Sequence, residues 1–382
     1  MNKIRAKSNI VLGALFILSL LAFIAVENSK VEIKQLWYKE KLEAARLAQK
    51  AAGYIKNFRM KQGVFVDDIN DPNETALIGQ EYTLITTDRG YIKAKLTSLN
   101  PNFAAVIVQM LKDAGVKPHD NVAVGVTGSF PAMNIALYAA LQTLELNPVI
   151  ISSVGSSNWG ANDPDFTWPD MENLLFKAGI FKFKSVAASK GGGLDKGRGL
   201  SPQGRNLLEQ AILRNNLIYI NEEHLENSIR RRMEIYDSIN NGKKYAVYIN
   251  VGGGIASLGN TINGKLIPAG LTEILPVKNY PVNGVIIKMG EQGIPIIHLL
   301  NIEKLARQYG LPESPVPLPE PGDGKIFYEK RYNLWVTGIS TFVLVALITF
   351  IFISEEKYHK LGNDIVHSSP QNNFKDEEFS GL

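Results

Sequence analysis

The sequence predicts an α/β domain, Rossmann-like with a mostly parallel sheet, placed between two transmembrane helices. Two uninterrupted apolar runs, one near each end of the 382-residue chain, predict the two helices. Between them, short apolar segments alternate with glycine turns and longer helical patterns, which is typical of βαβ units. The chain has no cysteine, which excludes a thiolate metal site and a cysteine nucleophile. Its net charge of +4 is too small to favour nucleic acid as a partner.

The two apolar runs cover residues 10–26 and 334–353, which are 17 and 20 residues without a charge. A helix of that length crosses a hydrocarbon core. The first run also fits a cleaved signal peptide, but it is longer than a usual signal-peptide core, and residues 25–28 form a poor cleavage site. Cations before the first run favour cytoplasmic termini. We therefore expect a two-pass protein of the cytoplasmic membrane whose central domain lies outside the cytoplasm.

The elements between the runs follow from hydrophobic periodicity and turn residues. An amphipathic helix is expected over 35–60, after the first span. A strand at 121–126, a helix at 132–146 and a strand at 148–154 form a βαβ unit, which implies a parallel sheet. We expect further strands at 183–188, 217–220, 245–251, 285–288 and 295–300, and further helices at 202–214, 222–239 and 302–309.

These elements divide the chain into seven parts. Residues 311–324 hold five of the 18 prolines, which predicts a semi-rigid spacer between domain and membrane. The parts are a basic N-terminus (1–9), the first span (10–26), a membrane-proximal amphipathic helix (27–63), the α/β domain (64–310), the proline-rich spacer (311–324), the second span (334–353) and a disordered tail (354–382).

The turn after the first strand of the βαβ unit is the first candidate site. It contains Thr127, Gly128 and Ser129 at the carboxyl end of a strand, where open α/β sheets bind ligands. Thr127 and Gly128 are predicted to bind a ligand, and Ser129 to act as a ligand or a nucleophile. The alternative is that Thr127 or Ser129 caps the following helix, the usual role of a hydroxyl there.

Two glycine-rich segments are further candidates for binding. Gly252, Gly253 and Gly254 follow another strand and allow close approach of a ligand, or form a plain structural turn. The loop 190–199 carries Lys190, Lys196 and Arg198, which suit carboxylates or phosphates. This loop lacks the lysine and hydroxyl of a nucleotide-binding P-loop, and a flexible surface loop is the alternative.

The segment 156–168 places acids and tryptophans after the strand that ends near residue 154. Asp163 and Asp165 are candidates for a general base or a cation ligand, with a run of Asx turns as the alternative. The five histidines lie far apart and predict no metal site, although folding could still bring together a triad such as Ser129, His298 and an aspartate. Residues 230–232, three arginines, are expected on a solvated helix with internal ion pairs. We expect no bound cofactor.

Nearly the whole chain resembles the bacterial poly-γ-glutamate system protein family. The segments that carry the resemblance are GVTGSFPAMNIALYAALQTLELNPVIISSVGSSNWGANDPDFTWPDME (125–172) and NVGGGIASLGN (250–260), together with the two terminal spans. The resemblance implies a role beside an ATP-dependent amide ligase and its small membrane partners in making or exporting the capsule polymer. It supplies no catalytic residues.

Three functions follow as expectations. The first is a membrane-anchored accessory protein of poly-γ-glutamate biosynthesis or export that binds the anionic polymer or the synthase membrane components. The second is a membrane-anchored hydrolase or transferase acting on γ-glutamyl amide bonds, with Ser129 as nucleophile or Asp163 and Asp165 as acid and base. The third is a cytoplasm-facing domain that binds a nucleotide through residues 252–254. Sequence alone leaves open whether the protein is an enzyme.

Overall fold

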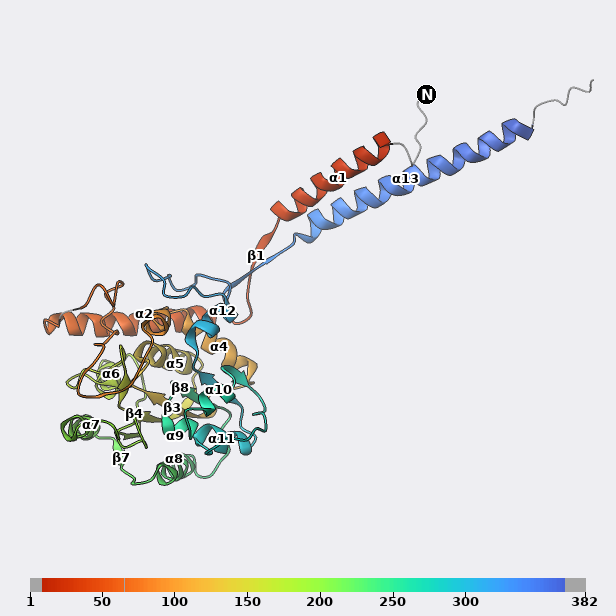
Figure 1. Cartoon of the computed structure of the whole chain (residues 1–382). Helices are drawn as coiled ribbons and strands as arrows, with labels where there is room; N and C mark the ends of the chain where they lie inside the picture. The colour runs from red at the N-terminus through yellow and green to blue at the C-terminus, as the bar shows by residue number, and fades with distance from the viewer. Residues whose placement is uncertain (1–8, 65, 368–382) are drawn as a thin grey trace, which may run out of the picture. The chain divides into compact units, whose positions relative to one another are not determined.

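The computed structural model describes residues 9–64 and 66–367, which form two compact units. One unit is the α/β domain, Lys34–Tyr328, and the other combines the two ends of the chain, Met1–Ile33 and Glu329–Leu382. Figure 1 shows the chain coloured from its N-terminus to its C-terminus. The predicted basic N-terminus falls almost wholly on residues 1–8, outside the described residues.

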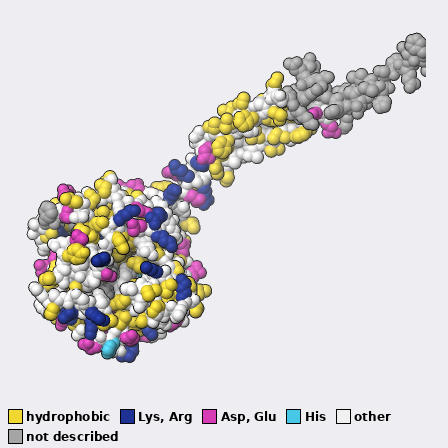
Figure 2. Space-filling view, viewed as in Figure 1, with side chains coloured by type: hydrophobic (Ala, Val, Ile, Leu, Met, Phe, Trp, Pro, Cys, Tyr) yellow, Lys and Arg dark blue, Asp and Glu magenta, His cyan; other side chains and the backbone are white. Residues whose placement is uncertain are grey.

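The unit made of the two chain ends contains two long helices, α1 (Asn9–Asn28) and α13 (Leu334–His367), which contact one another. The short strands β1 (Val31–Lys34) and β11 (Tyr328–Arg331) pair beside them. Both helices are long and apolar enough to cross a membrane, over Asn9–Asn28 and Leu334–Lys357, and neither of these stretches is buried in the protein. Hydrophobic side chains cover them (Figure 2).

The end of helix α13 corrects the prediction of a disordered tail from residue 354. The helix continues without a break from the apolar run through the charged residues to His367. Glu, Lys and Leu in this stretch are good helix formers, so a helix already nucleated in the apolar run extends through them. The rest of the predicted tail, 368–382, lies outside the described residues.

A seven-stranded sheet forms the centre of the α/β domain. Six strands are parallel, and the edge strand β9 is antiparallel to β10. In spatial order the strands are β7 (Ile218–Ile220), β6 (Ala187–Ser189), β4 (Asn147–Ser153), β3 (Asn121–Thr127), β8 (Tyr248–Val251), β10 (Ile296–Leu299) and β9 (Gly270–Thr272).

Most of the predicted strands are confirmed, but the strand expected at 285–288 is wrong. Residues Val285–Glu291 form helix α11, with Val285, Ile286, Ile287 and Met289 buried. A short run that is apolar on every side fits a buried helix as well as a buried strand, so periodicity cannot separate the two. The strand expected at 183–188 is shorter, and only its last residues belong to β6.

Helices cover both faces of the sheet (Figure 1). One face packs against α2 (Tyr38–Lys61), α4 (Phe103–Asp113), α5 (Pro131–Thr143), α6 (Trp168–Lys177) and α12 (Ile302–Tyr309). The other packs against α8 (Leu225–Ile239), α9 (Ile255–Leu258) and α11. Helix α7 (Pro202–Arg214) packs beside the β6–β7 edge, and the remaining elements are α3 (Ile92–Ser98), α10 (Asn263–Leu266), β2 (Thr86–Asp88) and β5 (Ser156–Ser157).

Strand alternation separates the two faces of the sheet. In β3, Val122, Val124 and Val126 point to the α2–α4–α5 core, while Ala123 points to the α8–α11 core. The first core is almost wholly apolar and buries the alanine-rich face of α2, including Ala44. Helix α2 was expected to be membrane-proximal and outside the domain, whereas the compact unit begins at Lys34 and includes it.

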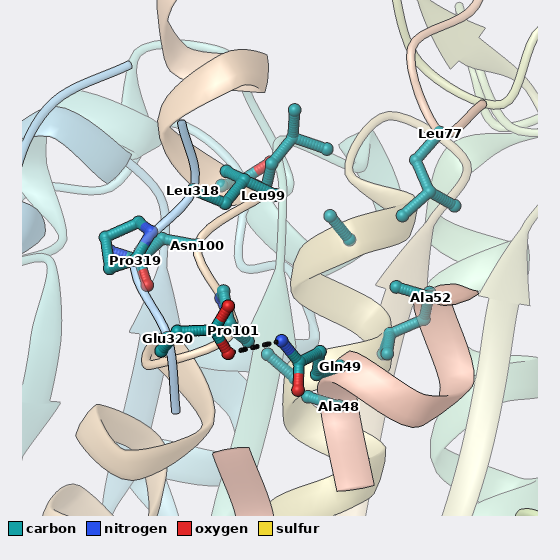
Figure 3. Close-up of a pocket in the computed structure, with 14 residues that line it drawn as sticks. Ala48, Gln49, Ala52, Leu77, Leu99, Asn100, Pro101, Leu318, Pro319 and Glu320 are labelled. Atoms are coloured by element: carbon teal, nitrogen blue, oxygen red, sulfur yellow. Dashed lines mark hydrogen bonds between the residues drawn. The ribbon is translucent and has the colours of Figure 1, made fainter. Parts of the chain in front are cut away.

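The proline-rich segment 311–324 is also part of this compact unit and is not a free spacer. The Asn102 side chain donates to the Glu320 carbonyl at 2.9 Å and accepts from the Gly322 amide at 3.2 Å. The Gln49 side chain on α2 donates to the Glu320 carboxylate at 3.0 Å (Figure 3). The segment closes over a small cavity of about 100 Å³ between α2 and α5. Tertiary hydrogen bonds therefore hold the segment against the domain, which corrects the prediction of a spacer between domain and membrane.

Candidate functional site

The carboxyl edge of the sheet brings together loops that are far apart in sequence. Strand β3 pairs with β4 on one side, with Thr127 opposite Ser153, and with β8 on the other, with Gly125 opposite Asn250. The chain therefore leaves β3 for one half of the sheet and returns to build the other half from β8. Ligands of open α/β sheets bind at such a reversal of strand order, beyond the carboxyl ends of the strands.

Thr127 and the glycine loop 252–254 converge at this point. A Cβ on Gly252 would lie 2.4 Å from the Thr127 Oγ1, and a Cβ on Gly254 would lie 3.0 Å from its Cγ2. Gly252 also has a φ of +87°, which favours glycine. Gly253, between them, is exposed. These glycines therefore let two loops approach one another, with only the tip of the second loop reaching solvent.

The hydroxyls of the first turn do not cap helix α5. The helix begins after Phe130, and no side chain accepts a hydrogen bond at its N-cap. Instead, the Thr127 Oγ1 accepts from the Ser129 amide at 3.3 Å, and the Ser129 Oγ accepts from the Ser157 amide at 3.1 Å. The capping alternative is wrong because Pro131 starts the helix two residues beyond Ser129. The Gly128 amide donates to the Ser153 carbonyl at 3.0 Å and joins the turn to β4.

A row of buried polar side chains crosses the sheet on the α8–α11 face, one from each of five neighbouring strands. We call it the polar row; it consists of Ser189, Ser153, Thr127, Asn250 and His298. The Asn250 Nδ2 and His298 Nδ1 are 3.1 Å apart, while the Asn250 Oδ1 and His298 Nε2 have no hydrogen-bond partner among the described residues. Burial lowers the pKa of His298 to about 4, so the imidazole is neutral at pH 7.

The polar row does not assemble the triad that the sequence left open. The ring of His298 contacts Asn250, whereas Ser129 contacts Ser157. The orphaned atoms of Asn250 and His298 are the kind of buried polar groups that a bound water or ligand satisfies. They lie on strands β8 and β10, next to the glycine loop.

The loop 190–199 is folded, which is contrary to the alternative of a flexible surface loop. Bridges join Gly191 to Lys196 and Gly193 to Arg198. The Asp195 side chain is buried and accepts hydrogen bonds from Ser189 at 2.7 Å and Ser228 at 2.5 Å. One acid inside the loop therefore fastens it to β6 and α8.

The main partner of Asp195 is Arg232 on α8. Their side chains form a salt bridge of 3.0 Å in which neither side chain is more than 2% exposed. Arg232 also donates to Ser189 at 2.6 Å and to Ser153 at 3.1 Å, so the pair joins two members of the polar row. The expected solvated helix holds only for Arg230 and Arg231, which pair with Glu234. The only signal in the sequence for the inward position of Arg232 is that it lies on the same face of the helix as the buried apolar residues.

Two of the three cations predicted to bind an anion in this loop already have acidic partners. Lys190 lies 2.9 Å from Glu209, and Lys196 lies 2.6 Å from Glu223. Arg198 is exposed. The loop is consequently closer to electrical neutrality than its sequence suggests.

The acidic segment forms turns and ion pairs. The Asp163 Oδ1 accepts from the Asp165 amide at 3.0 Å, which is an Asx turn, and the Asp163 Oδ2 accepts from Arg59 at 2.7 Å. Asp165 is exposed, and Trp168 is fully buried against Tyr138. This arrangement favours the structural alternative for the two aspartates.

Lys95 on α3 is a site residue that sequence reasoning missed. Its side chain is 2% exposed and reaches the loops after β3 and β4, where the Nζ donates to the Ser129 carbonyl and lies 2.9 Å from the Ser157 Oγ. No acid pairs with it within the described part of the chain, and burial lowers its pKa to about 7. A lysine in a helix is usually exposed, so nothing in the sequence marks this one.

Metal-ligand clusters and a second hollow were the other candidates for a site. Over residues 9–64 and 66–367, no cluster of three or more His, Asp or Glu side chains is arranged to hold a metal ion. A second hollow, of about 650 Å³, lies at the amino ends of β3 and β4 beside Asn121 and Asn147, away from the candidate site.

Comparison with known proteins gave no match: no family model, no curated protein and no solved structure is significantly similar to this chain.

Proposed function

We propose that the chain is a membrane-anchored accessory protein of poly-γ-glutamate biosynthesis or export, with an α/β domain that binds the anionic polymer or the synthase. We place it in the bacterial cytoplasmic membrane as a two-pass protein, with both termini cytoplasmic and the domain outside. The family resemblance is the basis for proposing the polymer and its synthase as partners. The two apolar helices support membrane attachment. The proposal involves no nucleic acid and no cofactor.

The observation that carries a binding function is the convergence of Thr127 with the loop 252–254 at the reversal of strand order. We also propose that the fold is Rossmann-like, because successive strands are added to the sheet outward from the β3–β8 pair, first on the β3 side and then on the β8 side. An extended polymer suits an edge of this kind, where the exposed Gly253 and Arg198 belong to the loops after β8 and β6, with β3 and β4 between these strands.

Two matched glycine variants test this binding site. A Cβ at Gly254 meets the Thr127 Cγ2 at 3.0 Å, whereas a Cβ at Gly53, on helix α2, meets no atom within 4 Å. We expect Gly254→Ala in the full chain, purified in detergent, to weaken poly-γ-glutamate binding by about tenfold, or 1.4 kcal/mol. Gly53→Ala is the control and leaves binding unchanged. Equal affinities of both variants and the wild type would contradict a polymer site at this loop.

Topology has a separate test. The chain has no cysteine, so Arg198→Cys introduces a single thiol at an exposed loop position. We expect a membrane-impermeant maleimide to label it in whole cells. Labelling only after lysis would place the domain in the cytoplasm and favour the nucleotide-binding alternative, with residues 252–254 as the phosphate loop.

A further inference from the structure

Lys95 and Ser157 form a closely packed pair at the carboxyl edge of the sheet. The Lys95 Nζ lies 2.9 Å from the Ser157 Oγ, within hydrogen-bond distance, and 3.9 Å from the centre of the Phe130 ring. It also donates to the backbone carbonyl of Ser129. The Ser157 side chain is 9% exposed, so this is a buried contact and not a chance surface approach.

These contacts suit a neutral lysine amine. A neutral amine has two N–H groups and one lone pair. The Nζ is placed to donate to the Ser129 carbonyl and to the Ser157 Oγ, and it lies over the face of the Phe130 ring. In the neutral form its two N–H groups can serve the carbonyl and the ring face, so that its lone pair accepts the hydroxyl hydrogen of Ser157. Burial without an acid partner favours this form, because it lowers the pKa of Lys95 to about 7. A serine whose proton can pass to an uncharged lysine is activated as a nucleophile.

We propose that Ser157 is a nucleophile and Lys95 its general base, in an acyl-transfer site for amide bonds of a carboxylate-bearing chain. The choice of γ-glutamyl amides as substrate rests on the proposed function, whereas the serine–lysine chemistry rests on the contact between Lys95 and Ser157 and on the burial of Lys95. The site differs from the predicted one, in which Ser129 was the nucleophile. Ser129 instead holds both partners: its carbonyl accepts from Lys95, and its hydroxyl accepts from the Ser157 amide.

The reaction balances with water or an amine as the only co-reactant. The Ser157 Oγ attacks the amide carbonyl carbon, and its proton passes to the Lys95 Nζ. The tetrahedral intermediate collapses, the C–N bond breaks, and the Lys95 ammonium gives its proton to the leaving amine. The acyl ester on Ser157 is then attacked by water, which gives hydrolysis, or by an amine, which gives transfer, with Lys95 taking the proton of the attacking group. The ester C–O bond breaks, and the Lys95 ammonium returns that proton to the Ser157 Oγ, which restores the starting pair.

A thin turn covers the pair. A Cβ on Gly90 would lie 2.9 Å from the Ser157 Oγ, and the Gly90 amide donates to the Asn158 Oδ1 at 2.9 Å. The Asn158 amide in turn donates to the Asp88 carbonyl at 3.1 Å. Residues 88, 89 and 91 on either side of Gly90 are exposed. A substrate reaches Ser157 when this turn moves aside, and the Asn158 side chain is one of the contacts that hold it.

A covalent serine probe tests the nucleophile without any polymer. We expect a fluorophosphonate to label the full chain in detergent at one residue, mapped to Ser157 by peptide mass spectrometry. Ser157→Ala abolishes the label, and Ser156→Ala, a change of the adjacent serine, keeps it. Asn158→Ala, which releases the covering turn, speeds labelling. A label on another residue, or no label on either the wild type or Asn158→Ala, overturns the proposal.

The role of Lys95 has its own readout in the pH profile. We expect wild-type labelling to rise with pH about a midpoint near 7, and Lys95→Met, which keeps the length of the side chain, to slow labelling at least tenfold at pH 7.5 and remove that midpoint. Thermal unfolding of Lys95→Met at or above the wild-type temperature shows that the loss is not one of folding. An unaltered pH profile in Lys95→Met overturns the assignment of the base.

Polymer assays separate this proposal from the proposed function. Shortening of poly-γ-glutamate chains by the wild type, absent in Ser157→Ala, supports both. Ser157 labelling with no change in polymer length keeps the nucleophile and rejects the polymer as its substrate. Polymer binding without Ser157 labelling keeps the accessory role and rejects the nucleophile.

Discussion

Two buried cations lie at the same edge of the sheet, and they differ in their partners. Arg232 and Lys95 are each 2% exposed. Arg232 has a buried acid, Asp195, at 3.0 Å and further hydrogen bonds to Ser189 and Ser153. Lys95 has a carbonyl, a hydroxyl and an aromatic face, but no acid within the described residues. The first arrangement stabilises a charge, and the second does not.

The difference separates a structural role from a chemical one. A buried charge needs a counter-charge and satisfied hydrogen bonds, or it loses its charge. The Arg232–Asp195 pair meets the first condition and joins the loop 190–199 to the strand ends. Lys95 loses its charge more readily instead, since burial lowers its pKa to about 7. The paired cation is therefore a fixed part of the fold, while the unpaired one can exchange a proton at physiological pH.

The largest expected effect comes from breaking the buried pair. Asp195→Asn leaves Arg232 charged and uncompensated, and we expect it to lower the free energy of unfolding by about 3–5 kcal/mol. Thermal unfolding of the full chain in detergent measures the change. The double variant Asp195→Asn/Arg232→Met removes both charges and should recover a large part of the loss. Single variants as stable as the wild type would show that the pair does not hold the loop.

The pH dependence of stability tests the other cation. The folded pKa of Lys95 is about 7 against an ordinary value of 10.5, so the unfolded chain binds more protons between these values. Stability therefore rises with pH across this window, by about 2 kcal/mol from pH 7 to pH 9. Lys41, whose burial lowers its pKa to about 8, adds to the same slope, and comparison with Lys95→Met isolates the Lys95 part. An identical slope in Lys95→Met would contradict the unpaired state.

The smallest effect is expected at an exposed pair in the same loop as Asp195. Lys196 pairs with Glu223, but their side chains are 31% and 85% exposed. Lys196→Ala should change the free energy of unfolding by no more than about 1 kcal/mol, because solvent screens such pairs. Chemical denaturation of the full chain in detergent measures it. A loss as large as that of Asp195→Asn would show that burial does not distinguish the two pairs.

The sequence predicted the regular parts of the fold and the strand-end loops of the site. Helices 202–214 and 302–309 match α7 and α12 residue for residue, because Ser201 and Gly310 mark their ends and their apolar spacing is helical. The turn at Thr127 and the loop 252–254 were identified from glycines that follow apolar strands. Buried runs such as 285–288 were misread, since apolar residues on all sides carry no period.

The sequence by itself determined the two apolar spans, the alternation of strands and helices, and the glycines that mark the strand ends, because each is written in residues near one another along the chain. Only the tertiary structure decided which polar residues are buried and which side chains they contact. Arg232 and Asp195 meet across 37 positions, and Lys95 and Ser157 across 62. The free energy of a buried charge depends on neighbours that such long separations bring together, so no local pattern reveals them.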